Sequence, residues 1–120
     1  MKQGLILFAH GSKDPEWARP FERIALSLKQ RLPAVAVALA YLEHGASLEE
    51  AVAALAAKGA TSIRVVPVFL GQGGHVKEDF PRLVGTAQSS FSGVKLVLEK
   101  AIGEQPAVIE AIASVIAEGR

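Results

Sequence analysis

The 120-residue sequence contains no cysteine. This absence excludes disulfide bonds, thiolate metal ligands, cysteine-ligated iron–sulfur clusters and a cysteine nucleophile, and it is compatible with a cytoplasmic location. No apolar run approaches the roughly 18–20 residues that a membrane-spanning helix requires. The net charge is only +1, and basic and acidic residues are interspersed, so the basic stripe of a nucleic-acid-binding protein is missing. We expect a cytoplasmic protein with neither a membrane nor a nucleic-acid partner.

Several catalytic motifs are also absent. The sequence has no G-x-S-x-G, which argues against a serine hydrolase. It has neither G-x-G-x-x-G in its first strand–helix turn nor G-x-x-x-x-G-K-[ST], which argues against a nucleotide site. A phosphorylatable aspartate is missing after the first predicted strand, because His10 occupies that position.

What the sequence does contain is apolar residues, which make up 50% of the chain and fall in short blocks. This pattern predicts a single compact domain over residues 1–120. Strands are predicted at 5–9, 34–42, 62–70 and 94–98, and helices at about 14–32, 47–58, 76–90 and 105–117. Four strands that are each followed by a helix predict an α/β fold, with a four-stranded parallel sheet of order 2-1-3-4 and helices on both faces.

Local signals set the predicted boundaries. Asp14-Pro15 should begin the first helix, and Ser47 with Glu50 forms a capping-box pattern for the second. Pro67 belongs near a strand end and Pro81 near a helix start, because proline lacks a backbone N–H. The first and last helices each have one apolar stripe, formed by Trp17, Phe21, Ile24, Leu28 and Leu32 in the first and by Val108, Ile109, Ile112 and Ile116 in the last.

Polar loop residues gather where the strands end. In sheets of this order, ligands bind outside the carboxyl ends of strands where the winding reverses, here between strands 1 and 3. His10 follows strand 1, and the run Gly71-Gln72-Gly73-Gly74-His75 follows strand 3. Glu43 and His44 follow strand 2 at the same edge. We therefore expect His10 and His75 to share one crevice, with Glu43 near it.

Imidazole with carboxylate suits borderline divalent cations such as cobalt, nickel, iron and zinc, and imidazole is the usual proton acceptor near neutral pH. Two histidines and an acid would leave coordination positions open, as metal transfer requires. Simpler interpretations remain: a loop histidine is commonly solvated, and the glycines after strand 3 either supply special backbone angles or cradle a phosphate.

Two stretches resemble a known family. They are Ala9-His10-Gly11-Ser12, and Val66-Pro67-Val68-Phe69-Leu70 leading into Gly73-Gly74-His75-Val76-Lys77-Glu78-Asp79-Phe80-Pro81. Both are similar to the short sirohydrochlorin chelatases, the ATP-independent cobaltochelatases of cobalamin synthesis that are related to siroheme ferrochelatases. The resemblance also includes Ala40-Tyr41-Leu42-Glu43 and Ser47 to Ala51, but His44-Gly45 departs from the family pattern.

The resemblance implies the three-layer, flavodoxin-like fold of chelatases and insertion of Co²⁺, Ni²⁺ or Fe²⁺ into sirohydrochlorin. The metal would be a substrate, with no permanently bound cofactor. Carried over, His10 and His75 are the metal-binding and catalytic histidines, and Glu43 assists them. The substrate-binding candidates are Ser12, Lys13, Gly73, Gly74 and Lys77, with Arg19 as a further partner for substrate carboxylates. A homodimer is implied because longer relatives have two such lobes facing a cleft. Two rival functions are a non-catalytic metal or tetrapyrrole binder, and a phosphate-ligand enzyme that uses the Gly71–His75 loop.

Overall fold

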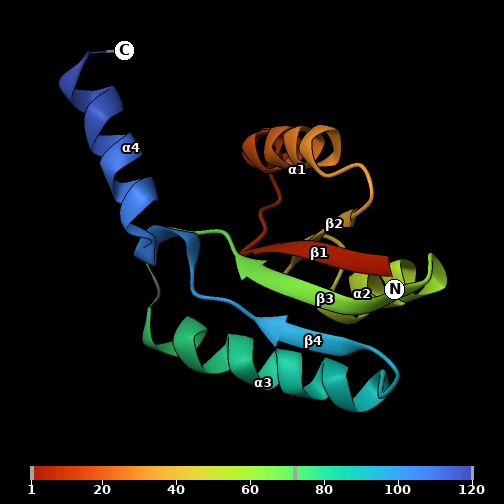
Figure 1. Ribbon diagram of the computed structural model, residues 1–120. Coiled ribbons are helices and arrows are strands. Elements are labelled where there is room, and N and C mark those ends of the chain that lie inside the picture. The colour runs from red at the N-terminus through yellow and green to blue at the C-terminus, as the bar shows by residue number, and fades with distance from the viewer. Residues whose placement is uncertain (1, 72, 120) are drawn as a thin grey trace.

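A computed structural model describes residues 2–71 and 73–119, with only the backbone described at residues 74–76. Ten elements follow one another along the chain (Figure 1): β1 (Lys2–Ala9), η1 (Pro15–Ala18), α1 (Arg19–Arg31), β2 (Ala36–Tyr41), α2 (Leu48–Ala57), β3 (Ala60–Pro67), α3 (Gly74–Ser90), β4 (Lys95–Leu98), η2 (Ile102–Glu104) and α4 (Pro106–Ala117). The elements η1 and η2 are 3-10 turns.

The four strands form one parallel sheet in the order β2-β1-β3-β4, as the alternating pattern predicted. The register pairs Ala9 with Tyr41 on one side of β1, and Phe8 with Pro67 on the other. The carboxyl ends of β1, β2 and β3 therefore meet at one edge of the sheet. Pro67 is the last residue of β3, where the prediction placed it.

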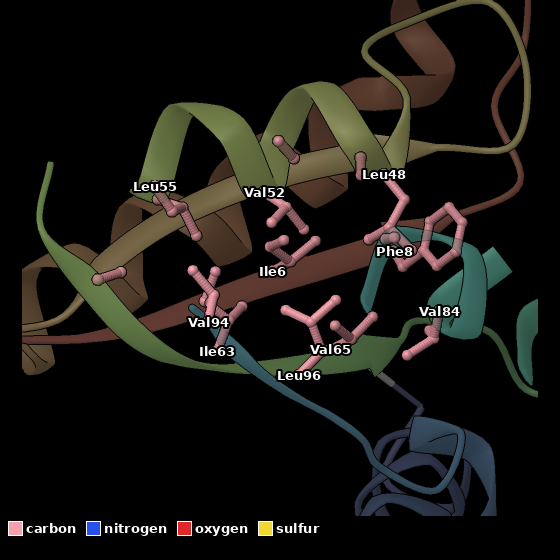
Figure 2. Packing of buried hydrophobic residues seen from close by; sticks show 14 of the residues in the cluster. Ile6, Phe8, Leu48, Val52, Leu55, Ile63, Val65, Val84, Val94 and Leu96 are labelled. Carbon is pink, nitrogen blue, oxygen red and sulfur yellow. The ribbon is translucent and has the colours of Figure 1, made fainter. Parts of the chain in front are cut away.

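Helices cover both faces of the sheet, which confirms the predicted fold class. The larger core lies between the sheet and the helices α2 and α3 (Figure 2). Phe8 and Phe80 meet edge to face in it, with ring centroids 4.5 Å apart. On the other face, α1 packs against β1 and β2 through a smaller cluster that includes Leu5, Leu7 and Ala25. Burial of these side chains supplies the main driving force for folding.

Of two predicted helix starts, the first differs in detail and the second forms as predicted. Asp14 caps the amide of Glu16 as expected, but the cap opens the 3-10 turn η1, and α1 begins only at Arg19. The reason is Pro20, which has no N–H to donate to the carbonyl of Glu16, so Arg19 donates to that oxygen instead. The capping box of α2 is present in full: Ser47 Oγ accepts from the Glu50 amide, and the Glu50 carboxylate accepts from the Ser47 amide.

The prediction for Pro81 is wrong. Helix α3 begins at Gly74, so Pro81 lies in its interior and not near its start. The proline is exposed, and it cannot donate to the carbonyl of Lys77.

The apolar stripe of the last helix is largely exposed. Helix α4 forms over the expected residues, but it extends away from the sheet of its own chain (Figure 1). Ile109, Ile112 and Ile116 are 52%, 37% and 73% exposed. Gln105 has an extended backbone and Pro106 follows it, so the chain changes direction before the helix begins. Among the described residues, no helix has both the length and the hydropathy to cross a membrane.

Candidate active site

The exits of β1 and β2 run side by side and carry His10 and Glu43. The amide of Leu42 donates to the Ala9 carbonyl at 3.0 Å, and the amide of Glu43 donates to the His10 carbonyl at 3.2 Å. The ladder thus continues beyond both strands and fixes the backbones of His10 and Glu43 next to each other. The predicted proximity of these two residues is confirmed.

Gly11 makes this close approach possible. Its φ is +98°, in the region that side chains rarely adopt. A Cβ at this position would lie 1.8 Å from the Glu43 carbonyl oxygen. Only glycine therefore allows the chain to leave β1 while the backbone of Glu43 passes against it.

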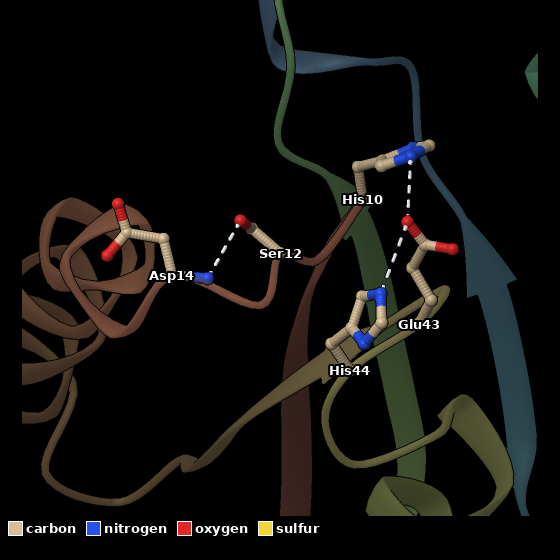
Figure 3. Close-up of polar contacts among 5 residues, drawn as sticks. All are labelled: His10, Ser12, Asp14, Glu43 and His44. Atoms are coloured by element: carbon tan, nitrogen blue, oxygen red, sulfur yellow. Dashed lines mark hydrogen bonds and ion pairs between the residues drawn. The ribbon is translucent and has the colours of Figure 1, made fainter.

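The Glu43 carboxylate lies between two imidazoles (Figure 3). Its Oε1 is 3.5 Å from Nε2 of His10 and 3.8 Å from Nε2 of His44. These side chains are accessible to ligands, with exposed fractions of 59% for His10, 54% for Glu43 and 35% for His44. The arrangement can hold a proton or a cation near the carboxylate without burying a charge.

His44 reaches the carboxylate because of a tight turn. Its φ is +58°, a left-handed conformation in which histidine is more frequent than most side chains. The turn is closed by the Tyr41 amide, which donates to the Ala46 carbonyl at 2.8 Å. A Cβ on Gly45 would lie 2.5 Å from Cδ2 of Tyr41, so a larger residue there would displace the Tyr41 ring. The sequence left the role of His44 open, and its contact with Glu43 was not foreseen.

A small depression lies next to these residues. Its volume is about 220 Å³, and its lining consists of Phe8, Tyr41, Leu42, Ser47, Leu48, Glu49 and Leu83. Tyr41 also contacts Trp17 edge to face, with ring centroids 6.1 Å apart. Partial burial, and secondarily the negative charge of Glu22, raise the pKa of the Tyr41 hydroxyl. Tyr41 thus remains a neutral, mainly apolar wall at neutral pH.

The candidate substrate-binding residues after β1 have different environments. Ser12 Oγ accepts from the Asp14 amide at 3.1 Å, and Figure 3 shows this pair apart from the group formed by His10, Glu43 and His44. Lys13 is exposed. Arg19 forms an exposed ion pair with Glu16 at 3.7 Å. The hydroxyl of Ser12 therefore orders the loop after β1.

The segment after β3 leaves from the same edge. Val68 donates its amide to the Phe8 carbonyl at 2.9 Å, beside the end of β1. Gly73 precedes α3 with φ −70°, and a Cβ there would meet open space, so this glycine is not required for a special backbone angle. Lys77 is exposed in the first turn of α3. The side chain of His75 lies outside the described residues, as does whatever surrounds Gly74, so their predicted place in the crevice stays a prediction.

Among the side chains that the structure describes, no three histidines or acids are arranged to hold a metal ion. His10 and His44 both contact one oxygen atom of Glu43. Gly11 is the functional residue that the sequence analysis did not single out. Gly11 lies between the end of β1 and the helix cap Asp14, and this position was the sequence signal for a glycine with a special backbone conformation.

Comparison with known proteins identifies the family of this chain. The CbiX family model matches residues 4–119. A sirohydrochlorin cobaltochelatase from Methanosarcina acetivorans is 37% identical over 84 residues, which are 69% of this chain and 65% of that protein. The aligned part is therefore just under two thirds of that relative.

Solved structures of chelatases have the same fold as this chain. A structure described as a CbiX protein of cobalamin (vitamin B12) biosynthesis, from Marinobacter aquaeolei, is 32% identical with a TM-score of 0.86, and the alignment covers 98% of this chain and 96% of that one. The sirohydrochlorin chelatase SirB from Bacillus subtilis, in complex with cobalt, is 26% identical with a TM-score of 0.83; the alignment covers 98% of this chain and 51% of SirB. The model match over nearly the whole chain shows that this protein belongs to the CbiX family.

Proposed function

We propose that the protein inserts a divalent metal ion into sirohydrochlorin, with cobalt as the first candidate and nickel or ferrous iron as the others. The observation that carries the proposal is the Glu43 carboxylate set between two imidazoles at the sheet edge where ligands bind. The relative named sirohydrochlorin cobaltochelatase supports the substrate, and the cobalt complex of SirB supports the metal. The product would serve cobalamin or siroheme synthesis.

The reaction requires a proton acceptor and an open coordination site. Two pyrrole N–H protons leave the macrocycle as one divalent cation enters it, so the net products are the metallated ring and two protons. A neutral imidazole accepts a proton near neutral pH and also binds these cations. Histidines at an accessible sheet edge can perform both tasks.

We assign His10 and His75 as the catalytic, metal-binding residues, and Glu43 as the acid that assists them. Nε2 of His10 faces Glu43, so the carboxylate can orient the ring and stabilise its protonated form. The other ring nitrogen would then be left for the metal or the proton. The 3.5 Å separation is longer than a short hydrogen bond and can tighten when substrate binds.

The exposure of the His10 and Glu43 side chains suits transfer of a metal ion better than its storage. A metal ion held by one or two accessible imidazoles keeps several waters and is released readily. The acidic macrocycle would be attracted by Lys13, Lys77 and Arg19. Ser12, Gly73 and Gly74 would contribute backbone atoms along the loops that face the ring.

A second copy of the chain would complete the binding cleft. The 220 Å³ depression beside Tyr41 is smaller than the roughly 300–1,000 Å³ of most small-molecule pockets. The SirB chain is about twice as long as the part that this chain matches. Both observations support a homodimer in which two lobes face one macrocycle. The cytoplasmic location stays a prediction from the lack of cysteine.

The test is an anaerobic assay with sirohydrochlorin and Co²⁺, and then Ni²⁺ or Fe²⁺, which follows the absorbance change on metal insertion. We expect His10→Ala and His75→Ala each to lower the rate about 100-fold, as removal of a general base does. Glu43→Gln should lower it about 10-fold. Glu104→Gln, an exposed acid in η2, is the matched control and should retain the full rate.

Two outcomes would contradict the proposal. If no metal is inserted faster than in the protein-free reaction, the protein is a binder without turnover, and titration of the macrocycle or Co²⁺ alone would then detect the binding. If the wild-type protein is active but both histidine variants keep the full rate, the site assignment is wrong.

A further inference from the structure

His44 is a residue of the candidate site to which the proposed function gives no role. Among the described residues other than glycine, it is the only one with a positive φ, at +58°. Glycine adopts this conformation without the steric cost that a side chain adds. A histidine in such a position points to the chemistry of its ring, because the turn itself does not require one.

The ring of His44 has a single polar contact in the part of the chain that the structure describes. This contact is with the Glu43 carboxylate (Figure 3). The Nε2 atom lies 3.8 Å from Oε1, which is beyond hydrogen-bond distance. The His44 side chain is 35% exposed, so its ring nitrogens are open to a ligand from solvent.

The separation of these two atoms fits two ligands of one divalent cation. Bonds of about 2.0–2.2 Å to nitrogen and oxygen, as in Zn²⁺ sites, place two ligand atoms about 3.4 Å apart at the tetrahedral angle. The observed 3.8 Å exceeds this by a few tenths of an ångström, which small rotations of two accessible side chains can remove. Imidazole nitrogen with carboxylate oxygen also suits cobalt, nickel and zinc.

The carboxylate is already positioned and keeps its charge available. Hydrogen bonding of the Glu43 amide to the His10 carbonyl fixes the backbone at this point. Within the described residues, no lysine or arginine forms an ion pair with Glu43; its partners are the imidazoles of His10 and His44. The negative charge is therefore not neutralised by a permanent cation of the protein.

We propose that Glu43 and His44 form a two-ligand site that binds a divalent cation such as Co²⁺ beside His10. No third acid or histidine among the described side chains completes it, so water fills the other coordination positions and the cation exchanges readily. The site would load the cation next to the residues that insert it. Transfer to His10 is then a ligand exchange, in which one neutral imidazole replaces another and the cation keeps its charge. The loading role rests on the proposed function, whereas binding of the cation does not.

Binding of Co²⁺ in the absence of macrocycle tests the site. The chain has three histidines, so His10→Ala/His75→Ala keeps His44 alone, and the imidazole C–H signals in the proton NMR spectrum then belong to that residue. We expect paramagnetic Co²⁺ to shift or broaden these signals in a saturable way. Glu43→Gln in this background should weaken the affinity about tenfold, because the anionic ligand is lost. Glu104→Gln, an exposed acid in η2, is the matched control and should leave the affinity unchanged.

Two results of this titration would overturn the proposal. If Co²⁺ leaves the His44 signals unchanged, the residue does not bind the cation. If Glu43→Gln and Glu104→Gln have the same affinity, His44 binds Co²⁺ as a lone surface imidazole and the pair does not exist. Far-ultraviolet circular dichroism establishes that each variant is folded before it is titrated.

The chelatase assay tests the loading role in a chain that retains His10 and His75. His44→Asn keeps the turn, because asparagine also adopts the left-handed conformation, but it removes the imidazole. We expect the KM for Co²⁺ to rise about tenfold with a much smaller change in kcat, as loss of a binding interaction does. A fall in kcat at an unchanged KM would mean that His44 acts on the chemical step through Glu43, and would refute the loading role. If the wild type inserts no metal but the titration shows paired binding, the proposed function fails and the metal site stands.

Discussion

Replacement of Gly11 by alanine should disturb both the fold and the site. The added Cβ would lie 1.8 Å from the Glu43 carbonyl oxygen and 2.9 Å from its carbonyl carbon, both of them backbone atoms that no rotamer change can move away. The loop after β2 must therefore shift. Glu43 would move with it, away from His10.

The magnitude follows from two contributions. A left-handed conformation costs a non-glycine residue about 1–2 kcal/mol. The shift also weakens the hydrogen bonds that Leu42 and Glu43 donate to the β1 exit, each of which contributes about 0.5–1.5 kcal/mol. We expect Gly11→Ala to lower the free energy of unfolding by about 2–4 kcal/mol, which corresponds to a decrease in Tm of about 10 °C for a domain of this size.

Urea unfolding at a fixed protein concentration measures this loss, and the chelatase assay at a temperature where the variant is folded measures displacement of the site. Gly71→Ala is the matched control, because a Cβ at Gly71 meets open space and its φ is not in the left-handed region. It should change stability by less than about 1 kcal/mol. If Gly11→Ala is as stable and as active as Gly71→Ala, then the approach of Glu43 to the β1 exit does not constrain this position.

Two further changes test the core and the exposed face of the sheet. Phe80→Ala should cost about 3–5 kcal/mol, because it removes a ring that contacts both Phe8 and Phe69, with centroids at 4.5 and 4.9 Å; denaturation by urea measures it, and a loss below about 1 kcal/mol would contradict the packing described. Glu99 accepts two hydrogen bonds from the Arg64 guanidinium, at 2.6 and 2.9 Å, and these hold the pKa of its carboxyl below the ordinary value of 4.5. A lowered folded pKa means that this contribution to stability is present above pH 4.5 and is lost as pH falls through the folded value. Because the pair is partly exposed, we expect less than about 1 kcal/mol, seen as a smaller decrease in stability between pH 6 and 3 for Glu99→Gln than for wild type; equal decreases would refute the assignment.

Much of the fold followed from local sequence patterns. The strands read from Leu5–Ala9 and from the valine-rich run after Ser62 are present, and alternation with helices was enough to give the strand order. Parallel topology then placed His10 and Glu43 at one edge, because the carboxyl ends of neighbouring parallel strands coincide. The capping box at Ser47 was predictable because both of its hydrogen bonds form within four consecutive residues.

Two local features were not predicted from the apolar periodicity. The left-handed conformation of His44 arises from the turn that packs Gly45 against Tyr41, and its contact with Glu43 follows from that turn. Pro20 divided the first helix into η1 and α1, although the apolar stripe runs through both. Neither effect changes the periodicity from which a helix is read.

The sequence by itself determined the element order, the parallel sheet and the edge that carries His10 and Glu43, because periodicity and chain connectivity are local properties. The tertiary structure decided that Gly11 lets Glu43 approach His10, and that α4 leaves the sheet of its own chain. An apolar stripe identifies the face of a helix that favours burial, but only the path of the connecting chain, here the change of direction at Gln105 and Pro106, decides where that face lies.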